Sequence, residues 1–163
     1  MIRSRTLFRK SLAPLLILLG IGPLSYGVIV WEEGNFHVVA EGQVYRSRQL
    51  DPEELARHVH HYGIRSVLNL RGKNPGSRWY REEILAAESL GLRHYDYGIS
   101  ANRDVADQDI ERILGILREA PKPLLIHCMS GADRTSLVAA LYLYRMECKS
   151  PEEAERQLSL RYG

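Results

Sequence analysis

Apolar residues form one long uninterrupted run near the N-terminus and then a series of short segments. The long run covers residues 12–31, within a stretch (11–31) that has no charged side chain. Beyond residue 35 the apolar segments have the length of strands, which usually contain about four to eight residues between turn-forming residues. Strands are predicted at residues 36–39, 43–46, 64–70, 92–97 and 124–126.

Apolar residues at helical spacing predict helices between these strands. The first helix begins after Asp51, a capping residue that is followed by Pro52 at the first helical position and Glu54 at the third. Further helices are predicted at residues 79–90, 108–119 and 134–146, and a last one after Ser150. Strands that alternate with helices indicate an α/β fold with a mostly parallel central sheet flanked by helices.

The long apolar run predicts a transmembrane helix. Twenty helical residues span about 30 Å, the thickness of the hydrocarbon core of a bilayer. We therefore expect a basic tail (1–10), a signal anchor (11–31) and one folded domain (35–163). Because basic residues precede the anchor and Glu32 and Glu33 follow it, the N-terminus is expected in the cytoplasm and the domain on the opposite, extracytoplasmic side. A cleaved signal peptide, which would release a secreted domain, and a buried core helix are the alternatives.

Composition limits the classes of partner and of site. The net charge is +2, but the first ten residues hold four basic groups, so the remainder carries 18 basic and 20 acidic residues. This balance gives no electrostatic case for a nucleic-acid partner. Cys128 and Cys148 are too few for a disulfide framework or a cysteine-only zinc site, and whether they can pair with each other is an open geometric question.

One segment between a predicted strand and a predicted helix carries most of the candidate chemistry. It consists of His127, Cys128, Met129, Ser130, Gly131, Ala132, Asp133, Arg134 and Thr135. The backbone N–H groups of such a loop can converge on one anion, and the following helix adds its positive dipole end. Gly131 permits close backbone approach or a positive φ, and Arg134 is spaced to hold two anion oxygens. Residues 129–134 are therefore predicted to bind an anion.

Cys128 lies at the base of this predicted anion site. Hydrogen-bond donors and positive potential favour the thiolate over the thiol, so Cys128 is expected to ionise more readily than an ordinary cysteine. A thiolate that faces a bound phosphate monoester is a nucleophile facing phosphorus. In the alternative interpretation, Cys128 is a small buried residue at a strand end and Arg134 is a surface charge.

The segment resembles the Cys-x5-Arg-Ser/Thr signature of the cysteine-dependent protein tyrosine phosphatases. The short chain looks most like the compact bacterial dual-specificity branch, and the similarity extends over residues 35–160, including residues 44–47 and 66–71. Many members of the family have Gly where this chain has Ser136. Members that act on highly phosphorylated inositols tend to have Lys where this chain has Asp133, which weighs against an inositol phosphate as substrate.

The resemblance implies roles for individual residues. Cys128 would form a phosphocysteine intermediate, and Arg134 would bind the substrate and stabilise the transferring phosphoryl group. Thr135 would donate a hydrogen bond to the Cys128 sulfur, and His127 would order the loop from behind. The family uses neither a metal nor another cofactor, and the implied substrates are phosphotyrosine or phosphoserine proteins or small phosphate esters. No oligomeric state is implied.

The family also supplies a general acid from an Asp upstream of the nucleophile, and three candidates are present. Asp96 lies in a predicted strand, and Asp107 precedes the helix at 108–119 and has an alternative role as its N-cap. Asp104 lies in a polar loop from which an acid could reach the site. We favour Asp104 because of this loop position.

Two other functions and one surface feature stay open. Cys-x5-Arg loops also occur in rhodanese-like and arsenate-reducing enzymes, and a phosphoprotein-binding module that has lost turnover would keep the same loop. The basic residues around a predicted Gly/Pro loop are either a solvated face or a rim that attracts phosphorylated substrates. They are Arg71, Lys73, Arg78 and Arg81.

Overall fold

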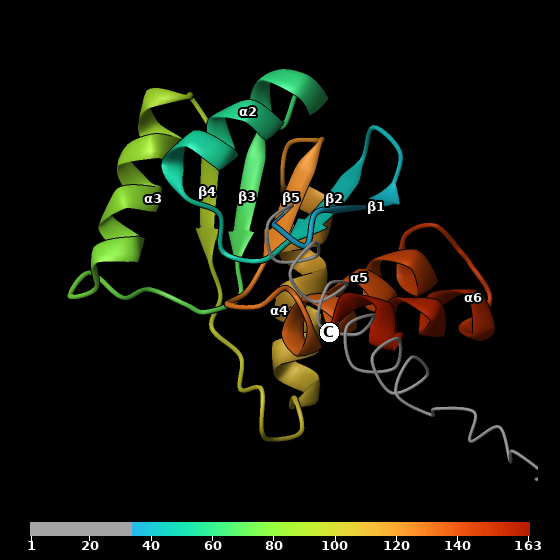
Figure 1. Cartoon of the computed structure of the whole chain (residues 1–163). Helices are drawn as coiled ribbons and strands as arrows, with labels where there is room; N and C mark the ends of the chain where they lie inside the picture. Colours follow the sequence, from blue (N-terminus) through green and yellow to red (C-terminus); the bar gives the residue numbers. More distant parts are fainter. Residues whose placement is uncertain (1–33) are drawn as a thin grey trace, which may run out of the picture.

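A computed structural model describes residues 34–163, which form a central sheet covered by helices on both faces (Figure 1). The strands are β1 (His37–Ala40), β2 (Val44–Ser47), β3 (Ser66–Asn69), β4 (Arg93–Asp96) and β5 (Leu124–His127). The helices are α2 (Pro52–Tyr62), α3 (Arg78–Ser89), α4 (Asp107–Glu119), α5 (Asp133–Arg145) and α6 (Pro151–Glu155), followed by two 3₁₀ turns, η1 (Arg156–Leu158) and η2 (Leu160–Tyr162).

The strand order is β1-β2-β5-β3-β4, and four of the five strands run parallel. Only β1 is antiparallel among the described strands, and it pairs with β2 at one edge. The α/β fold with helices around a mostly parallel sheet is therefore confirmed. The sheet is mixed because the hairpin of β1 and β2 adds one reversed edge strand.

Alternate positions along the strands face different helical layers, as the period of two in a strand requires. Tyr45, Val67 and Leu125 pack in one cluster with α2 and α3. Val44, Leu68 and Ile126 pack in a second cluster with α4, α5 and α6. The apolar run of β5 is buried on both faces, as expected for a central parallel strand.

The capping signals give the helix positions closely, with one exception. Asp51 caps α2 in a reciprocal arrangement with Glu54, and Gly63 ends this helix in the left-handed conformation. The interpretation of Asp107 as an N-cap is wrong: α4 begins at Asp107, and the cap position is Ala106, whose side chain has no hydrogen-bonding group. An acidic residue in the first turn is still favoured there by the helix dipole.

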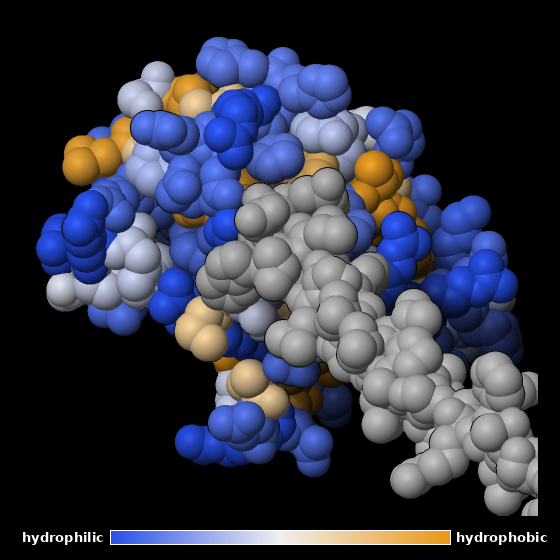
Figure 2. Space-filling view, viewed as in Figure 1, coloured by the Kyte–Doolittle hydropathy of each residue, from blue (hydrophilic) through white to orange (hydrophobic). Residues whose placement is uncertain are grey.

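On the face seen in Figure 2, hydrophilic side chains cover most of the described surface and apolar ones are scattered. Among residues 34–163 no helix is both long and apolar enough to cross a membrane. The predicted basic tail (1–10) and signal anchor (11–31) lie outside the described residues.

Candidate active site

The segment with the phosphatase-like signature joins the central strand β5 to the helix α5. β5 ends at His127 and α5 begins at Asp133, so residues 128–132 form the connecting loop, here called the catalytic loop. It leaves the carboxyl edge of the parallel strands, where α/β folds commonly bind ligands. The predicted strand–loop–helix context is thus confirmed, with the helix starting one residue earlier than expected.

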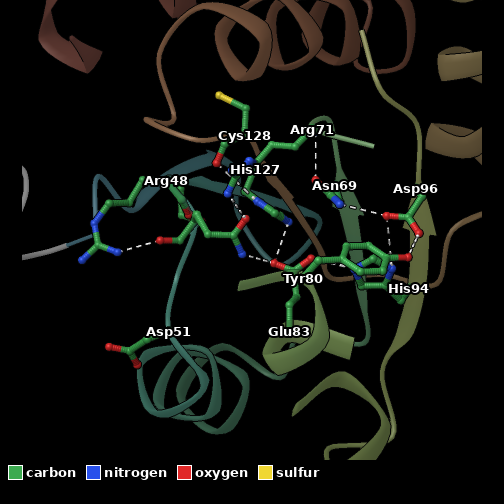
Figure 3. Close-up of polar contacts among 12 residues, drawn as sticks. Arg48, Asp51, Asn69, Arg71, Tyr80, Glu83, His94, Asp96, His127 and Cys128 are labelled. Atoms are coloured by element: carbon green, nitrogen blue, oxygen red, sulfur yellow. Dashed lines mark hydrogen bonds and ion pairs between the residues drawn. The ribbon is translucent and has the colours of Figure 1, made fainter. Parts of the chain in front are cut away.

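Cys128 is buried at the start of the catalytic loop, with 2% of its surface exposed. The next two residues, Met129 and Ser130, are exposed. Figure 3 shows the Cys128 side chain pointing away from the polar cluster that lies behind the loop. Cys148 is exposed, and neither cysteine is in a disulfide. The thiol therefore lies at the bottom of a loop whose rim is open to solvent.

Gly131 occupies a position that only glycine fits. Its φ is +77°, and a Cβ there would lie 2.7 Å from the backbone N of Arg48 and from the backbone carbon of Ser47. The close approach places the catalytic loop directly against the segment that follows β2. The positive φ and close backbone approach expected at Gly131 are thus confirmed, and its part in binding an anion stays a prediction.

A buried arginine from β2 supports the catalytic loop on the α5 side. Arg46 donates to the carbonyl of Gly131 and to the Ser136 hydroxyl, each at 2.7 Å. It also donates to the carbonyl and side-chain oxygens of Gln157, and its guanidinium stacks 3.7 Å from the centre of the Tyr162 ring. Burial lowers the pKa of Arg46 to about 10, while Tyr162 and Cys128 act in the opposite direction. Ser136, the departure from the family pattern, is therefore a partner of this arginine.

Arg134 lies in the first turn of α5 and extends toward the end of β3. One of its terminal nitrogens donates to the carbonyl of Leu70 at 3.2 Å. Its Nε is buried and has no hydrogen-bond partner among the described residues. Its predicted role in holding anion oxygens is compatible with this position and stays a prediction.

The guanidinium of Arg71 interacts electrostatically with Cys128. Arg71 stacks 3.5 Å from the centre of the Trp79 ring and donates to the side-chain oxygen of Gln49 at 3.1 Å. Burial lowers the pKa of Arg71, and the nearby charge of Arg134 lowers it further, while Glu83 and Cys128 oppose both effects. Arg71 therefore belongs to the electrostatic environment of Cys128.

The other basic residues of the predicted rim have different surroundings. Arg78 is fully exposed and pairs with Glu82 on its own helix. Arg81 donates to the carbonyls of Pro75 and Gly76, and Lys73 is exposed. Of this group, the solvated-face interpretation suits Arg78 and Lys73, and the substrate-rim interpretation suits Arg71.

His127 and Thr135 are both buried next to the catalytic loop. The His127 ring lies 3.2 Å from a carboxylate oxygen of Glu83 and 3.4 Å from the Cys128 carbonyl oxygen. This position is compatible with its expected role in ordering the loop, which stays a prediction. The Thr135 hydroxyl is buried without a hydrogen-bond partner among the described residues, so its bond to the Cys128 sulfur stays a prediction.

The three candidate acids have different environments. Asp104 is exposed in the loop between β4 and α4, and Asp107 is exposed in the first turn of α4. Asp96 ends β4 and accepts hydrogen bonds from Asn69 at 2.8 Å and from the Tyr80 hydroxyl at 2.5 Å. Among residues 34–163, Asp96 therefore has side-chain partners that Asp104 lacks, which keeps Asp104 as our candidate.

Sequence reasoning missed two charged residues that support the loop, Arg46 and Glu83. Both are charged residues at positions where the sequence pattern predicts apolar ones. Arg46 follows Val44 at the spacing of one strand face, and Glu83 lies three residues from Tyr80 and from Ala86 on the buried face of α3. A charged residue at a buried position of an amphipathic element indicates a buried partner.

A family model matches most of the sequence. The sequence matches the model of the tyrosine phosphatase family over residues 30–152. An mRNA-capping enzyme from Caenorhabditis elegans is 26% identical over 105 residues, which are 63% of this chain and 17% of that enzyme. The chain thus spans less than a fifth of the length of this relative.

Solved structures of phosphatases share the fold. TpbA of P. aeruginosa, in complex with pTyr, is 22% identical with a TM-score of 0.61, over 80% of this chain and 75% of that chain. The catalytic core of the PP-IP phosphatase SIW14 from S. cerevisiae is 23% identical with a TM-score of 0.63, over 78% and 77%. Since the family model covers well over half of the sequence, including the whole catalytic loop, the chain belongs to the tyrosine phosphatase family.

Proposed function

We propose that the protein hydrolyses phosphate monoesters with Cys128 as nucleophile. The observation that carries the proposal is the position of Cys128, buried at the base of a loop that opens the helix α5, with the charges of Arg46 and Arg71 acting on it and Arg134 in the first turn of that helix. Positive charge and a helix N-terminus at a cysteine favour the thiolate and attract a phosphate group.

The reaction has two steps. The Cys128 sulfur attacks phosphorus, the bond to the ester oxygen breaks, and Asp104 gives its proton to that oxygen. A water molecule then attacks the phosphocysteine, Asp104 takes the proton from the water, and the S–P bond breaks to release inorganic phosphate. Arg134 and the loop amides stabilise the charge on the transferring group in both steps.

The substrates that we propose are phosphotyrosine or phosphoserine proteins and small phosphate esters. Family membership supports this class, and so does the similarity to TpbA, which was solved with pTyr. SIW14, also similar in fold, is a PP-IP phosphatase, so the class of phosphate ester is a matter for direct assay.

Hydrolysis of para-nitrophenyl phosphate by the full chain tests the proposed activity. Cys128→Ser should lower turnover by about 10³-fold or more, because the hydroxyl is a far weaker nucleophile than a thiolate. Cys148→Ser is the matched control and should keep wild-type turnover, since Cys148 is exposed and outside the site. Vanadate should inhibit. Sulfur transfer from thiosulfate without phosphatase activity would instead indicate a rhodanese-like enzyme, and binding without turnover a phosphoprotein-binding module.

The general acid is tested with two classes of ester. Asp104→Asn should slow hydrolysis of an alkyl phosphate about 10²-fold or more, because its leaving oxygen needs a proton. An activated aryl phosphate should be affected far less. The same split in Asp96→Asn or Asp107→Asn, with Asp104→Asn unaffected, would show that another residue is the acid.

We also propose that residues 11–31 anchor the protein, with the catalytic domain outside the cytoplasm. The apolar length and the flanking charges support this orientation. The protein should stay with membranes after extraction at alkaline pH, and a protease added outside should reach the domain. Release of a shortened chain would indicate a cleaved signal peptide.

A further inference from the structure

A buried carboxylate on α3 contacts two histidines behind the catalytic loop. Glu83 has 5% of its surface exposed. One of its oxygens lies 2.7 Å from Nε2 of His94, and the other lies 3.2 Å from Nε2 of His127 (Figure 3). The side-chain amide of Gln49 donates to the second oxygen as well. Glu83 thus makes hydrogen bonds with Gln49 and His94 and lies at ion-pair distance from His127, whose Nε2 has no hydrogen bond among the described residues.

These partners decide the charge of Glu83. Burial alone raises the pKa of a carboxyl group, but attraction by His127 and then the hydrogen bond and attraction of His94 hold the pKa of Glu83 well below its usual range. A buried ion is tolerated only when it is paired and its hydrogen-bonding capacity is used. The cluster of these residues is therefore built around a charged carboxylate.

The contacts of Glu83 lead to both sides of the nucleophile. His127 immediately precedes Cys128, and its other ring nitrogen lies 3.4 Å from the Cys128 carbonyl oxygen. Gln49 receives the hydrogen bond of Arg71 on its side-chain oxygen, and its backbone N–H donates to the carbonyl of Met129. One carboxylate is thereby linked to the residues before and after Cys128 and to the guanidinium of Arg71.

Nε2 of His127 lies at ion-pair distance from the Glu83 carboxylate, although it makes no hydrogen bond among the described residues, and the other ring nitrogen faces the Cys128 carbonyl. An ion pair with the carboxylate requires the charged imidazolium, which also carries an N–H toward the carbonyl. The other ionisable groups of the surroundings are His94 and Asp96 on β4, 3.8 Å apart, Tyr80 on α3 and Arg71 after β3.

We propose that Glu83 is a positioning residue of the active site, which holds His127 as a charged ring behind Cys128 and, through Gln49, fixes Met129 and Arg71. The proposal rests on the proposed function only in taking Cys128 as the nucleophile. His127 directly precedes Cys128 in the chain, so a positive ring there adds to the positive charge that favours the thiolate. Glu83 thus contributes to the nucleophile without contacting the substrate.

Alkylation of Cys128 by iodoacetamide as a function of pH tests the electrostatic part. The measurement uses the full chain with Cys148→Ser, so that Cys128 is the thiol that reacts. Glu83→Gln keeps the size of the side chain but removes its charge. It also replaces one acceptor oxygen by an amide group, whose N–H would face the donors that surround Glu83. The midpoint of the alkylation profile should move to higher pH, with a rate about tenfold lower at mildly acidic pH, a shift of about one pH unit.

Glu82→Gln is the matched control for the alkylation measurement. Glu82 is the neighbour of Glu83 on α3 and pairs with the exposed Arg78. The pH profile of Cys128 alkylation in Glu82→Gln should therefore equal that of the wild type. A Glu83→Gln protein that folds, loses phosphatase activity and keeps the wild-type alkylation midpoint would overturn the proposal, because a merely structural role predicts that result.

The ¹⁵N resonances of the His127 ring give a test that needs no variant. In the wild-type chain they should report a charged ring at neutral pH, and a neutral ring there would overturn the proposal even if Glu83→Gln failed to fold. Neither measurement depends on phosphatase turnover. If Cys128→Ser kept full activity, the proposed function would fail while the charge of His127 was still measured independently.

Discussion

The two faces of the sheet support the catalytic loop with buried side chains of opposite charge. On the side of α5 and α6, Arg46 is completely buried and donates to two carbonyls, a hydroxyl and an amide oxygen. On the side of α2 and α3, Glu83 is buried among Gln49 and two histidines. Figure 3 shows the second cluster lying behind Cys128.

The two faces differ in how the charge of their buried groups responds to pH. The acceptors around Arg46 are neutral dipoles, and the guanidinium stays charged at any pH below its pKa of about 10. Glu83 is itself ionisable and has two histidines among its partners, and the folded protein lowers the pKa of Glu83. One face therefore gives support that is constant with pH, and the other gives support that is coupled to protonation.

Replacement of Arg46 should have the largest effect on stability. Arg46→Met keeps much of the side-chain volume but leaves the Gly131 carbonyl and the Gln157 oxygens without their donor. We expect a loss of about 3 kcal/mol in the free energy of unfolding, because unsatisfied buried acceptors are costly. Urea denaturation should show the same loss from about pH 5 to pH 8, where arginine does not titrate. A loss that varied strongly with pH would contradict the assignment of constant support to this face.

Replacement of Glu83 should have a smaller effect, and one that depends on pH. The pKa of Glu83 is lower in the folded protein than its ordinary value of 4.5, so the charged form stabilises the fold above that pH. This contribution is lost as the pH falls below about 4.5. Glu83→Gln should therefore cost about 2 kcal/mol near neutral pH, with a cost that declines steadily below about pH 4.5.

The same urea series with Glu82→Gln gives the baseline for Glu83. The Glu82 side chain is partly exposed and its ion pair with Arg78 is on the surface. Glu82→Gln should therefore change the free energy of unfolding by no more than a few tenths of a kcal/mol. A cost for Glu83→Gln that did not change with pH would show that the carboxylate is not the charged centre of the cluster.

The same two faces show how far the sequence predicts this protein. The catalytic loop was predictable because its residues are contiguous and lie between an apolar strand and a helix. The start of α2 was predictable because its capping box is local. Arg46 and Glu83 stand out in the sequence only as charges at apolar positions. Their partners were not predictable, because they are distant in sequence: Gln157 is 111 positions from Arg46, and Gln49 is 34 positions from Glu83.

The candidate acids show a different limit. Loop position separated Asp104 from Asp96, and the structure adds that Asp96 is bonded to Asn69 and Tyr80. No sequence pattern indicates those bonds, since they depend on the parallel pairing of β3 with β4 and on where α3 packs. Partners across a sheet follow from topology, which local periodicity does not determine.

Ser136→Ala changes only the face of the sheet on which Arg46 lies. It removes one of four acceptors of Arg46 and leaves the other three in place. The expected cost is about 1.5 kcal/mol, the low end of the net contribution of a hydrogen bond to a charged group. If Ser136→Gly, the residue common in the family at this position, were as stable as wild type, the hydroxyl would contribute nothing to loop support.

Combining one change from each face tests whether the two supports are independent. Ser136 and Glu83 share no hydrogen-bond partner and lie on opposite sides of the sheet. The costs of Ser136→Ala and Glu83→Gln should therefore add to within about 0.5 kcal/mol in the double variant. A larger coupling energy would mean that the catalytic loop transmits strain between the faces. The constant and the pH-dependent support would then act as one unit, because a change on either side would alter how firmly the other holds residues 128–132.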